Sequence, residues 1–338
     1  MKSLNFMTPR KGQLVKVAED LYWARFELPF RLNHINVYFL ESDNGWTIID
    51  CGINDENTRE HWEQLFLGPL KNINIDKIII THHHPDHIGF SSELEKMSNA
   101  SFFISKSEKE NAEWLMKTNE TELLSVIIKA YESYNLNKKD INTLKKRGSK
   151  YKQRVKKLPY LKIIEEGEKI RSKYGEWEVR LDEGHSPEHI SLIDKTRKLY
   201  ISADFLLPRI SPNISADLRD INSDRLGSYL NYLLEFSNLE DDFKIFPGHD
   251  WPFTKGGSRA KELIMHHKKR LEKLLIAAEV NTLTVNSSID ILFGRKFDEH
   301  ELFFASGEAR AHLNHLVKTK KLRLFKNDQN VDFFNLFK

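Results

Sequence analysis

The chain has 338 residues, 40% of them hydrophobic and 30% charged, a length that suits one large domain or one domain with a small appendage. Its formal net charge of only +3 gives no sign that the whole molecule binds polyanions, and its single cysteine, Cys51, excludes an intrachain disulfide. The N-terminus lacks an apolar secretion segment and no run is long enough to span a membrane, so we expect a cytoplasmic protein without a membrane partner.

The N-terminal part of the chain predicts β-strands that lead to a histidine-rich segment. Four runs rich in β-branched and aromatic residues predict strands at residues 14–17, 21–26, 35–40 and 46–49. The residues Asp43-Asn44-Gly45 are a hairpin turn signal before the last of these runs. The following residues predict a helix over 57–67, a strand over 75–80, a helix over 90–97 and a strand over 101–104.

A helical insertion interrupts this pattern at about residues 106–160. Between residues 108 and 157 glycine is nearly absent, proline is absent and the apolar residues have helical spacing, which predicts two or three helices. Strands resume at residues 163–164, 177–181, 190–193 and 198–201, followed by a helix over 226–236 and a strand at 243–246. Two halves of mixed strands and helices fit a layered α/β fold.

The C-terminal part predicts a separate small domain. The chain is helical after Arg259, and a helix over residues 307–320 precedes two apolar runs at 322–325 and 331–334, with a turn at Asn327-Asp328 between them. A helix followed by a β-hairpin resembles a winged-helix-like module. We therefore divide the chain into residues 1–258 and a C-terminal domain at 259–338, an appendage of a size that can serve contacts in a homodimer.

The segment THHHPDHIG, at residues 81–89, is the most informative motif in the chain. It follows the predicted strand at 75–80, so its side chains emerge together from the end of a buried strand. His82, His84, Asp86 and His87 have the spacing H-x-H-x-D-H. Imidazole and carboxylate groups suit zinc and related divalent ions, and a strand end holds them rigidly. The motif therefore predicts a metal site.

This segment resembles the signature of the metallo-β-lactamase superfamily. Four further segments match the motifs of that family in the same order, namely IIDCG at 48–52, EGHS at 183–186, SAD at 202–204 and FPGHD at 246–250. The resemblance spans about residues 12–275 and implies an α/β fold, the four-layer αβ/βα sandwich with metals at one end. It does not identify the substrate, because this fold carries many chemistries.

The resemblance implies two divalent metal ions held by seven side chains. The matching side chains are His82, His84 and His185 for the first ion, Asp86, His87 and His249 for the second, and Asp204 as a bridge. Zinc is expected, with iron or manganese as alternatives, and no organic cofactor is required. Two dications beside two carboxylates stay net positive and hold a bridging hydroxide as nucleophile at neutral pH. Asp86 is also a candidate catalytic group that passes a proton to the leaving group.

Other polar residues near these motifs have competing interpretations. Asp50 either orients a histidine or the histidine-rich loop, which we favour, or forms a purely structural turn at the strand end. His83 is expected to point away from the ligands, where it is structural or exposed. His189 either packs or caps locally, or supports a ligand or faces the substrate. His266 and His267 lie on a charged helix and are expected to be solvated.

We predict a hydrolase that attacks the ester, thioester or lactone carbonyl of a small-molecule or acylated substrate with the bridging hydroxide. The ligand set resembles that of glyoxalase II, but the glutathione-binding C-terminal helices of that enzyme are not recognisable here. Asp204 argues against β-lactamase activity, because β-lactamases of this fold usually lack the bridging carboxylate. His84 argues against flavodiiron proteins, which typically carry glutamate at that position. The apolar residues of the insertion either line an acyl-binding groove or pack its helices onto the sheet.

The alternative function is a metal-dependent endoribonuclease. Residues 138–157 contain ten Lys or Arg residues and one acidic residue, a density that can follow phosphates but also fits a solvated helix face. Some superfamily members with a small winged-helix-like C-terminal module resemble RNA endonucleases. The basic residues of that module here are Lys318, Lys320, Lys321, Arg323 and Lys326. The sequence therefore leaves nucleic acid as a less favoured partner.

Overall fold

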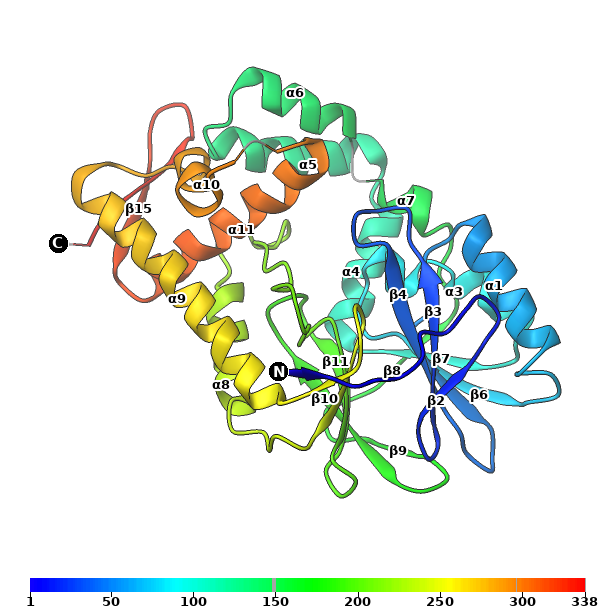
Figure 1. Ribbon diagram of the computed structural model, residues 1–338. Coiled ribbons are helices and arrows are strands. Elements are labelled where there is room, and N and C mark those ends of the chain that lie inside the picture. The colour runs from blue at the N-terminus through cyan, green and yellow to red at the C-terminus, as the bar shows by residue number, and fades with distance from the viewer. Residues whose placement is uncertain (148–149, 296, 338) are drawn as a thin grey trace.

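Two seven-stranded sheets form the centre of the computed structural model, which describes residues 1–147, 150–295 and 297–337 (Figure 1). The first sheet consists, in spatial order, of β2 (Val15–Ala18), β3 (Leu21–Glu27), β4 (His34–Leu40), β5 (Trp46–Ile49), β6 (Ile75–Ile79), β7 (Ser101–Ile104) and β8 (Leu161–Ile163). Strands β2 to β5 pair antiparallel, whereas β5 to β8 pair parallel. The carboxyl ends of β5 and β6 therefore meet at one edge of the sheet.

The second sheet faces the first and is antiparallel except for one pair. It consists, in spatial order, of β1 (Lys2–Ser3), β14 (Phe253–Thr254), β13 (Lys244–Pro247), β12 (Leu199–Ala203), β11 (His189–Asp194), β10 (Glu176–Asp182) and β9 (Lys169–Arg171). The parallel pair is β12 with β13. Strands β12 and β13 therefore end on the same side, as β5 and β6 do in the first sheet.

Apolar side chains alternate along the strands, so each sheet has one face toward the other sheet and one face toward helices. Trp23 and Trp177 are fully buried in the core between the sheets. The first sheet is covered by α1 (Glu56–Leu67), α3 (Ser91–Met97) and α4 (Lys106–Lys117), and the second by α8 (Arg225–Phe236) and α9 (Gly256–Val280). This arrangement confirms the predicted αβ/βα sandwich.

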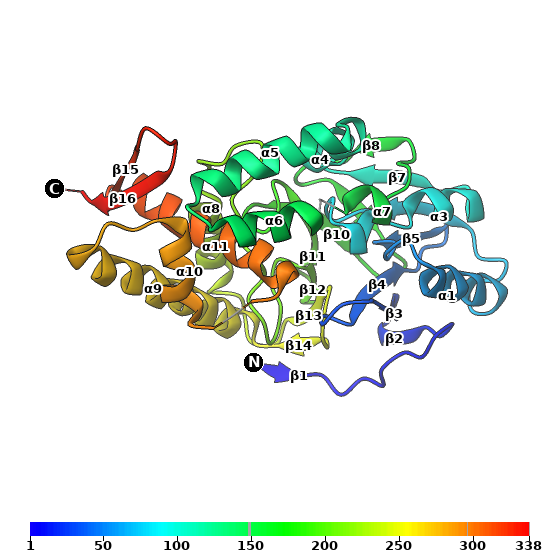
Figure 2. The same cartoon turned by 90° about the horizontal axis from the view of Figure 1, so that it is seen from above.

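Within its described residues the insertion contains four helices, not the two or three predicted. After α4 come α5 (Glu120–Ser133), α6 (Lys138–Arg147) and α7 (Tyr151–Arg154). Leu123 and Ile127 are buried in the same core as α8 and the C-terminal helices, and Tyr131 meets Phe303 edge to face with ring centroids 6.4 Å apart. In both views α6 lies beside α11 (Glu299–Lys318), and α5 lies beside α6 (Figure 1, Figure 2). The apolar residues of α5 therefore join the insertion to the C-terminal domain.

The C-terminal part has the predicted helix followed by a β-hairpin. It contains α10 (Val285–Phe293), α11 (Glu299–Lys318), β15 (Leu322–Lys326) and β16 (Asp332–Leu336). Helix α11 starts before the predicted Gly307, because Asp298 and Glu301 form a capping box that satisfies its first N–H groups. The predicted boundary near residue 258 falls in the first turn of α9. No helix in the described part of the chain combines the length and apolarity needed to span a membrane.

His267 is completely buried, so the prediction that it is solvated was wrong. Helix α11 covers this face of α9, and His312 of α11 is also completely buried. The Nδ1 atom of His312 donates to the carbonyl oxygen of Glu308 at 2.8 Å. Its Nε2 atom, 3.2 Å from Nδ1 of His267, therefore accepts a hydrogen bond from that ring. The two rings form a hydrogen-bonded link between α9 and α11, and Arg270 pairs with the carboxylate of Glu308 beside them.

Helix α8 offers a matched pair of leucines for testing the core of the second half. Leu233 is completely buried, whereas its neighbour Leu234 is 53% exposed. We expect Leu233→Ala to lower the free energy of unfolding by about 2–5 kcal/mol, because it leaves a cavity in the core. Leu234→Ala should change it by less than about 1 kcal/mol. Denaturant unfolding measures both values, and equal losses would contradict the packing described here.

The His312 ring predicts a loss of stability in mild acid. Burial lowers the pKa of His312 to about 3 in the folded protein, against about 6.5 in an unfolded chain. Between these values the unfolded state binds a proton that the folded state does not. The stability that the neutral, buried His312 allows is therefore complete above pH ~7, and it is lost as the pH falls toward 3. His312→Gln removes this titration, so its unfolding free energy should fall by about 1–2 kcal/mol less than that of the unaltered protein between pH 7 and 5. Urea unfolding at pH 7 and pH 5 measures both values. If the unfolding free energy falls equally in the variant and in the unaltered protein, the lowered pKa of His312 is contradicted.

Candidate metal centre

The structure brings all seven predicted ligands together at one end of the sandwich, where strands of both sheets end. His82 and His84 follow β6, and Asp86 and His87 lie on the one-turn helix α2 (Pro85–Ile88), which Pro85 starts. The remaining ligands follow β10, β12 and β13, and are His185, Asp204 and His249 respectively. Each sheet therefore supplies part of the site.

The first cluster consists of His82, His84 and His185. The Nε2 atom of His82 lies 2.9 Å from Nδ1 of His84 and 3.3 Å from Nε2 of His185. Burial, together with repulsion from neighbouring imidazoles, holds the pKa of His82 and that of His84 well below the ordinary value. Neutral imidazoles keep the nitrogen lone pairs that a metal ion requires.

The second cluster consists of Asp86, His87 and His249. The Oδ2 atom of Asp86 lies 3.8 Å from Nε2 of His87 and 3.6 Å from Nε2 of His249. Both imidazoles are buried, whereas the side chain of Asp86 is 20% exposed. The second cluster therefore has one carboxylate that solvent can reach.

Asp204 lies between the two clusters. Its Oδ2 atom is 3.5 Å from Nε2 of His185 in the first cluster, and 3.5 and 3.3 Å from Nε2 of His87 and His249 in the second. A Cβ atom at Gly248 would lie only 2.3 Å from Oδ1 of Asp204, so the glycine makes room for this carboxylate. The carboxylate of Asp204 therefore faces ligand nitrogens of both clusters.

Two buried atoms at this centre have no hydrogen-bond partner among the described residues, Nε2 of His87 and Oδ1 of Asp204. Buried polar atoms of this kind are rare and call for a partner. Burial lowers the pKa of His87, but Asp50, Asp204 and Asp86 outweigh it and hold that pKa well above the ordinary value. This excess of negative charge, beside unpartnered ligand atoms, fits divalent cations.

Asp50 orients the histidine-rich loop, as predicted. Its carboxylate accepts hydrogen bonds from the amide of Thr81 at 2.8 Å, the hydroxyl of Thr81 at 2.9 Å and Nδ1 of His87 at 2.8 Å. These contacts leave Nε2 of His87 facing the second cluster. The backbone φ of Asp50 is +70°, and Ala203 and Asp250, next to ligands, also have positive φ. The surrounding contacts hold the backbone in sparsely populated conformations at this site.

Two backbone carbonyl groups orient further ligands, and the sequence analysis missed both. His249 donates from Nδ1 to the carbonyl oxygen of His34 at 2.6 Å. His185 donates from Nδ1 to the carbonyl oxygen of Asn213 at 2.9 Å. Each bond leaves Nε2 of the ring directed at the metal centre. Every residue has a carbonyl group, so no sequence signal could have identified these partners.

The remaining histidines near the motifs support the site without joining a cluster. His83 points away from the ligands, as predicted, and its Nδ1 lies 2.5 Å from a carboxylate oxygen of Glu108. His189 is completely buried, and its Nε2 accepts from the backbone N–H of Asp204 at 3.2 Å. His189 therefore supports a ligand by holding the backbone of Asp204.

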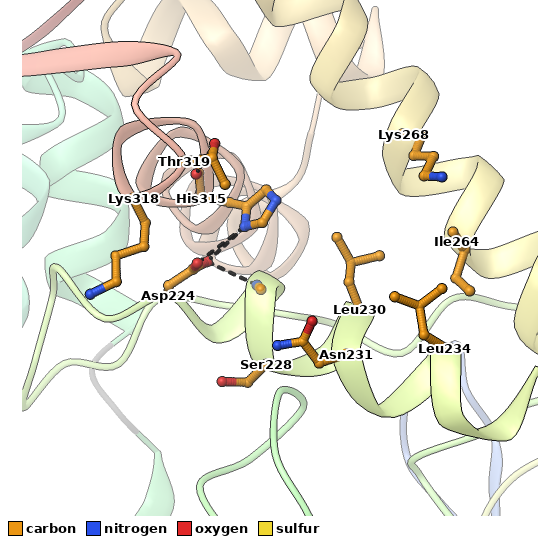
Figure 3. A pocket seen from close by; sticks show the side chains of 11 residues that line it. Asp224, Ser228, Leu230, Asn231, Leu234, Ile264, Lys268, His315, Lys318 and Thr319 are labelled. Atoms are coloured by element: carbon orange, nitrogen blue, oxygen red, sulfur yellow. Dashed lines mark hydrogen bonds and ion pairs between the residues drawn. The ribbon is translucent and has the colours of Figure 1, made fainter.

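A cavity of about 530 Å³ lies away from the seven ligands, between α8, α9 and α11 (Figure 3). The carboxylate that lines it, Asp224, is already paired. It accepts from the backbone N–H of Gly227 at 2.8 Å and from Nδ1 of His315 at 3.1 Å. The residues that line this cavity include none of the ligands. This cavity is therefore separate from the candidate metal centre.

Comparison with known families agrees with this site. A model of the metallo-beta-lactamase superfamily matches residues 31–249, which include all seven ligands. A model of the metallo-beta-lactamase-like C-terminal domain matches residues 271–336. The chain belongs to the metallo-beta-lactamase superfamily. It is a metal-dependent hydrolase of this family, as its motifs predict.

Individual relatives match nearly the whole chain. A probable metallo-hydrolase of Bacillus subtilis (strain 168), YqjP, is 26% identical over 325 residues, which cover 93% of this chain and 98% of the relative. A beta-lactamase domain protein from Burkholderia ambifaria is 29% identical, with a TM-score of 0.85 over 98% of this chain and 97% of its own. A metallo-beta-lactamase family protein from Thermus thermophilus shares the fold at 23% identity, with a TM-score of 0.77 over 95% and 100% of the two chains.

Replacement of Asp50 should weaken metal binding at the second cluster. An amide has only one acceptor oxygen, so the side chain in Asp50→Asn cannot accept hydrogen bonds from both Thr81 and His87 as the carboxylate does. We therefore expect zinc to bind at the second cluster about 10–100-fold more weakly. Elemental analysis after dialysis against graded chelator concentrations measures this change. The control is Asp55→Asn, because Asp55 caps α1 and asparagine caps helices equally well. Unchanged zinc retention in Asp50→Asn, or the same loss in the control, would contradict the role of Asp50.

Proposed function

We propose that this chain hydrolyses the ester, thioester or lactone carbonyl of a small or acylated substrate, using two divalent cations held by the seven ligands. The observation that carries the proposal is the position of Asp204, whose Oδ2 atom lies within 3.5 Å of ligand nitrogens in both clusters. A carboxylate shared between two groups of ligands supports a dinuclear centre.

Zinc is the metal that the donor set favours. The ligands are five imidazoles and two carboxylates, and they include no thiolate. Imidazole-rich sites suit zinc, copper, iron and nickel, whereas magnesium and calcium prefer oxygen donors. When bound, a pair of such cations lowers the pKa of water and polarises a substrate oxygen. Iron and manganese remain alternatives that metal analysis distinguishes.

Asp86 is the side chain that we assign to proton transfer. Its side chain is 20% exposed, whereas that of Asp204 is 8% exposed. A substrate can therefore reach the carboxylate of Asp86 more readily than that of Asp204. In this position Asp86 accepts a proton from the attacking water and returns it to the leaving oxygen or sulfur.

Apolar side chains on the loops around the ligands support an acylated substrate. Phe30, on the loop before β4, is 36% exposed, and Ile210, on the loop after Asp204, is 42% exposed. Trp251, which follows the ligand His249 by two residues, has the guanidinium carbons of Arg25 and Arg209 at 5.1 and 4.9 Å from its ring centroid. Exposed apolar side chains on these loops are groups that an acyl chain or the ring of an aromatic ester would contact.

The basic segment of the insertion gives no comparable support to the endoribonuclease alternative. Helix α6 packs its apolar residue Leu144 into the core, and Lys138, Lys139 and Lys145 are exposed on its surface. This is the arrangement of a solvated helix face. Gly148 and Ser149 of this segment lie outside the described residues. RNA cleavage is therefore an outcome to be tested.

Hydrolysis assays with the zinc-loaded protein test the proposal. We expect turnover of aryl esters, acyl thioesters or lactones that a chelator abolishes and zinc restores. His84→Ala removes a ligand of the first cluster and should lower kcat/KM by more than about 100-fold. His266→Ala, which alters a half-buried histidine on α9, is the control and should keep full activity.

The same zinc-loaded protein also tests the endoribonuclease alternative. A protein that ignores the acyl substrates but cleaves single-stranded RNA, with dependence on His84 and on salt, would be an endoribonuclease. Inactivity toward every acyl substrate in the panel, with zinc bound, would overturn the proposed substrate class.

A further inference from the structure

A buried carboxylate of the insertion contacts two loops of the metal centre. Glu108 lies in the first turn of α4, and its side chain is completely buried. Charged groups are rarely buried to this extent unless they are paired and hydrogen-bonded. The partners of Glu108 therefore indicate what this carboxylate does.

Glu108 joins the two loops that carry the first cluster. Its Oε2 atom accepts from the backbone N–H of His83 at 2.9 Å and lies 2.5 Å from Nδ1 of the same residue. Its Oε1 atom accepts from the backbone N–H of Glu188 at 3.0 Å. His83 lies between the ligands His82 and His84, and Glu188 follows the ligand His185 by three residues. One carboxylate thus connects the backbone beside all three imidazoles of the first cluster.

The insertion makes three further contacts with these two loops. The backbone N–H of Ser107 donates to Oε2 of Glu188 at 2.7 Å, and the hydroxyl of Ser105 donates to the carbonyl oxygen of Glu188 at 2.6 Å. On the other loop, the hydroxyl of Tyr151 donates to the carbonyl oxygen of His83 at 2.9 Å. Both loops are therefore held by residues of α4, its N-terminus and α7.

The environment of Glu108 keeps it ionised. Burial by itself raises the pKa of Glu108, but His83 and the amide of Glu188 outweigh this effect and lower the pKa to about 2. Hydrogen bonds to an ionised acceptor are about twice as strong as those between neutral groups. The link between the two loops is therefore stronger than a neutral side chain could make it.

We propose that Glu108 is a positioning residue of the metal centre, which holds the three imidazoles of the first cluster at the spacing that a cation requires. The inference rests on the proposed metal centre and gives the insertion a role in assembling it. The second cluster has its own support from Asp50, so the effect of Glu108 should be confined to the first. A purely structural role for Glu108 would lower stability without this selectivity.

Zinc release from the loaded protein tests the proposal. Glu108→Gln keeps the shape of the side chain but replaces one acceptor oxygen with an N–H donor that faces another donor. We expect one of the two zinc ions to pass to a chromophoric chelator at about 10-fold lower chelator concentration than in the unaltered protein. The second ion should be retained as before. Thermal unfolding of the same samples measures the accompanying change in Tm.

The matched control is Asp20→Asn. Asp20 is also a completely buried carboxylate that reaches a distant loop, because it accepts from the backbone N–H of Tyr174 at 3.0 Å and pairs with Arg197 at 2.6 Å. It adjoins the start of β3, away from the strand ends that carry the ligands. Asp20→Asn should lower Tm but leave the release of both zinc ions unchanged.

Tyr151→Phe provides a second, milder variant if Glu108→Gln does not fold. It removes the hydroxyl that contacts the carbonyl oxygen of His83, so it should ease release of the same zinc ion by a smaller factor. Unchanged release in whichever of the two variants folds, or equal easing in Asp20→Asn, would overturn the proposal. If the unaltered protein binds neither zinc, iron nor manganese, the metal centre and this inference both fail. If it binds two zinc ions but hydrolyses no acyl substrate, only the proposed substrate class fails.

Discussion

Desolvation of the ligands is the constraint on which the rest of this structure depends. Five imidazoles and two carboxylates lie in one small region, most of them buried. Buried polar atoms cost free energy unless each has a partner. The protein meets this requirement on the outer side of the rings, where Asp50, the carbonyl of His34 and the carbonyl of Asn213 each accept from Nδ1 of a ligand histidine. The inner nitrogen atoms are thereby left to a cation.

The partners that orient the ligands come from separate parts of the chain. Asp50 directly follows a strand of the first sheet, His34 begins another, and Asn213 lies on the loop after β12. Glu108 adds the insertion to this set, and α5 in turn packs against the C-terminal helices. Bound cations would join both sheets at one end, so metal binding should stabilise the whole sandwich by mass action. The insertion is thus connected to the candidate centre by hydrogen bonds, and the C-terminal domain is connected to the insertion by core packing.

Much of the fold and most of the candidate site could be predicted because their signals are local. Runs rich in β-branched and aromatic residues predicted most of the strands, and the H-x-H-x-D-H spacing placed four ligands within one short segment. The error at His267 arose where a second element decides the outcome, whereas the missed helix start is a local one. The charged neighbours of His267 indicated a solvated helix face, but α11 covers that face. Gly307 resembled a helix start, but the capping box at Asp298 begins α11 earlier.

The sequence by itself determined the family, the residue types of the ligand set and the two-halved order of strands and helices. These properties depend on short motifs and on the spacing of apolar residues. Both are defined by residues that are close together in the sequence. Only the tertiary structure decided which atoms orient the ligands, that Asp204 lies between the two clusters and that Glu108 joins the loops of His83 and Glu188. Those contacts link residues far apart in sequence, and their geometry exists only when both sheets and the insertion are packed together.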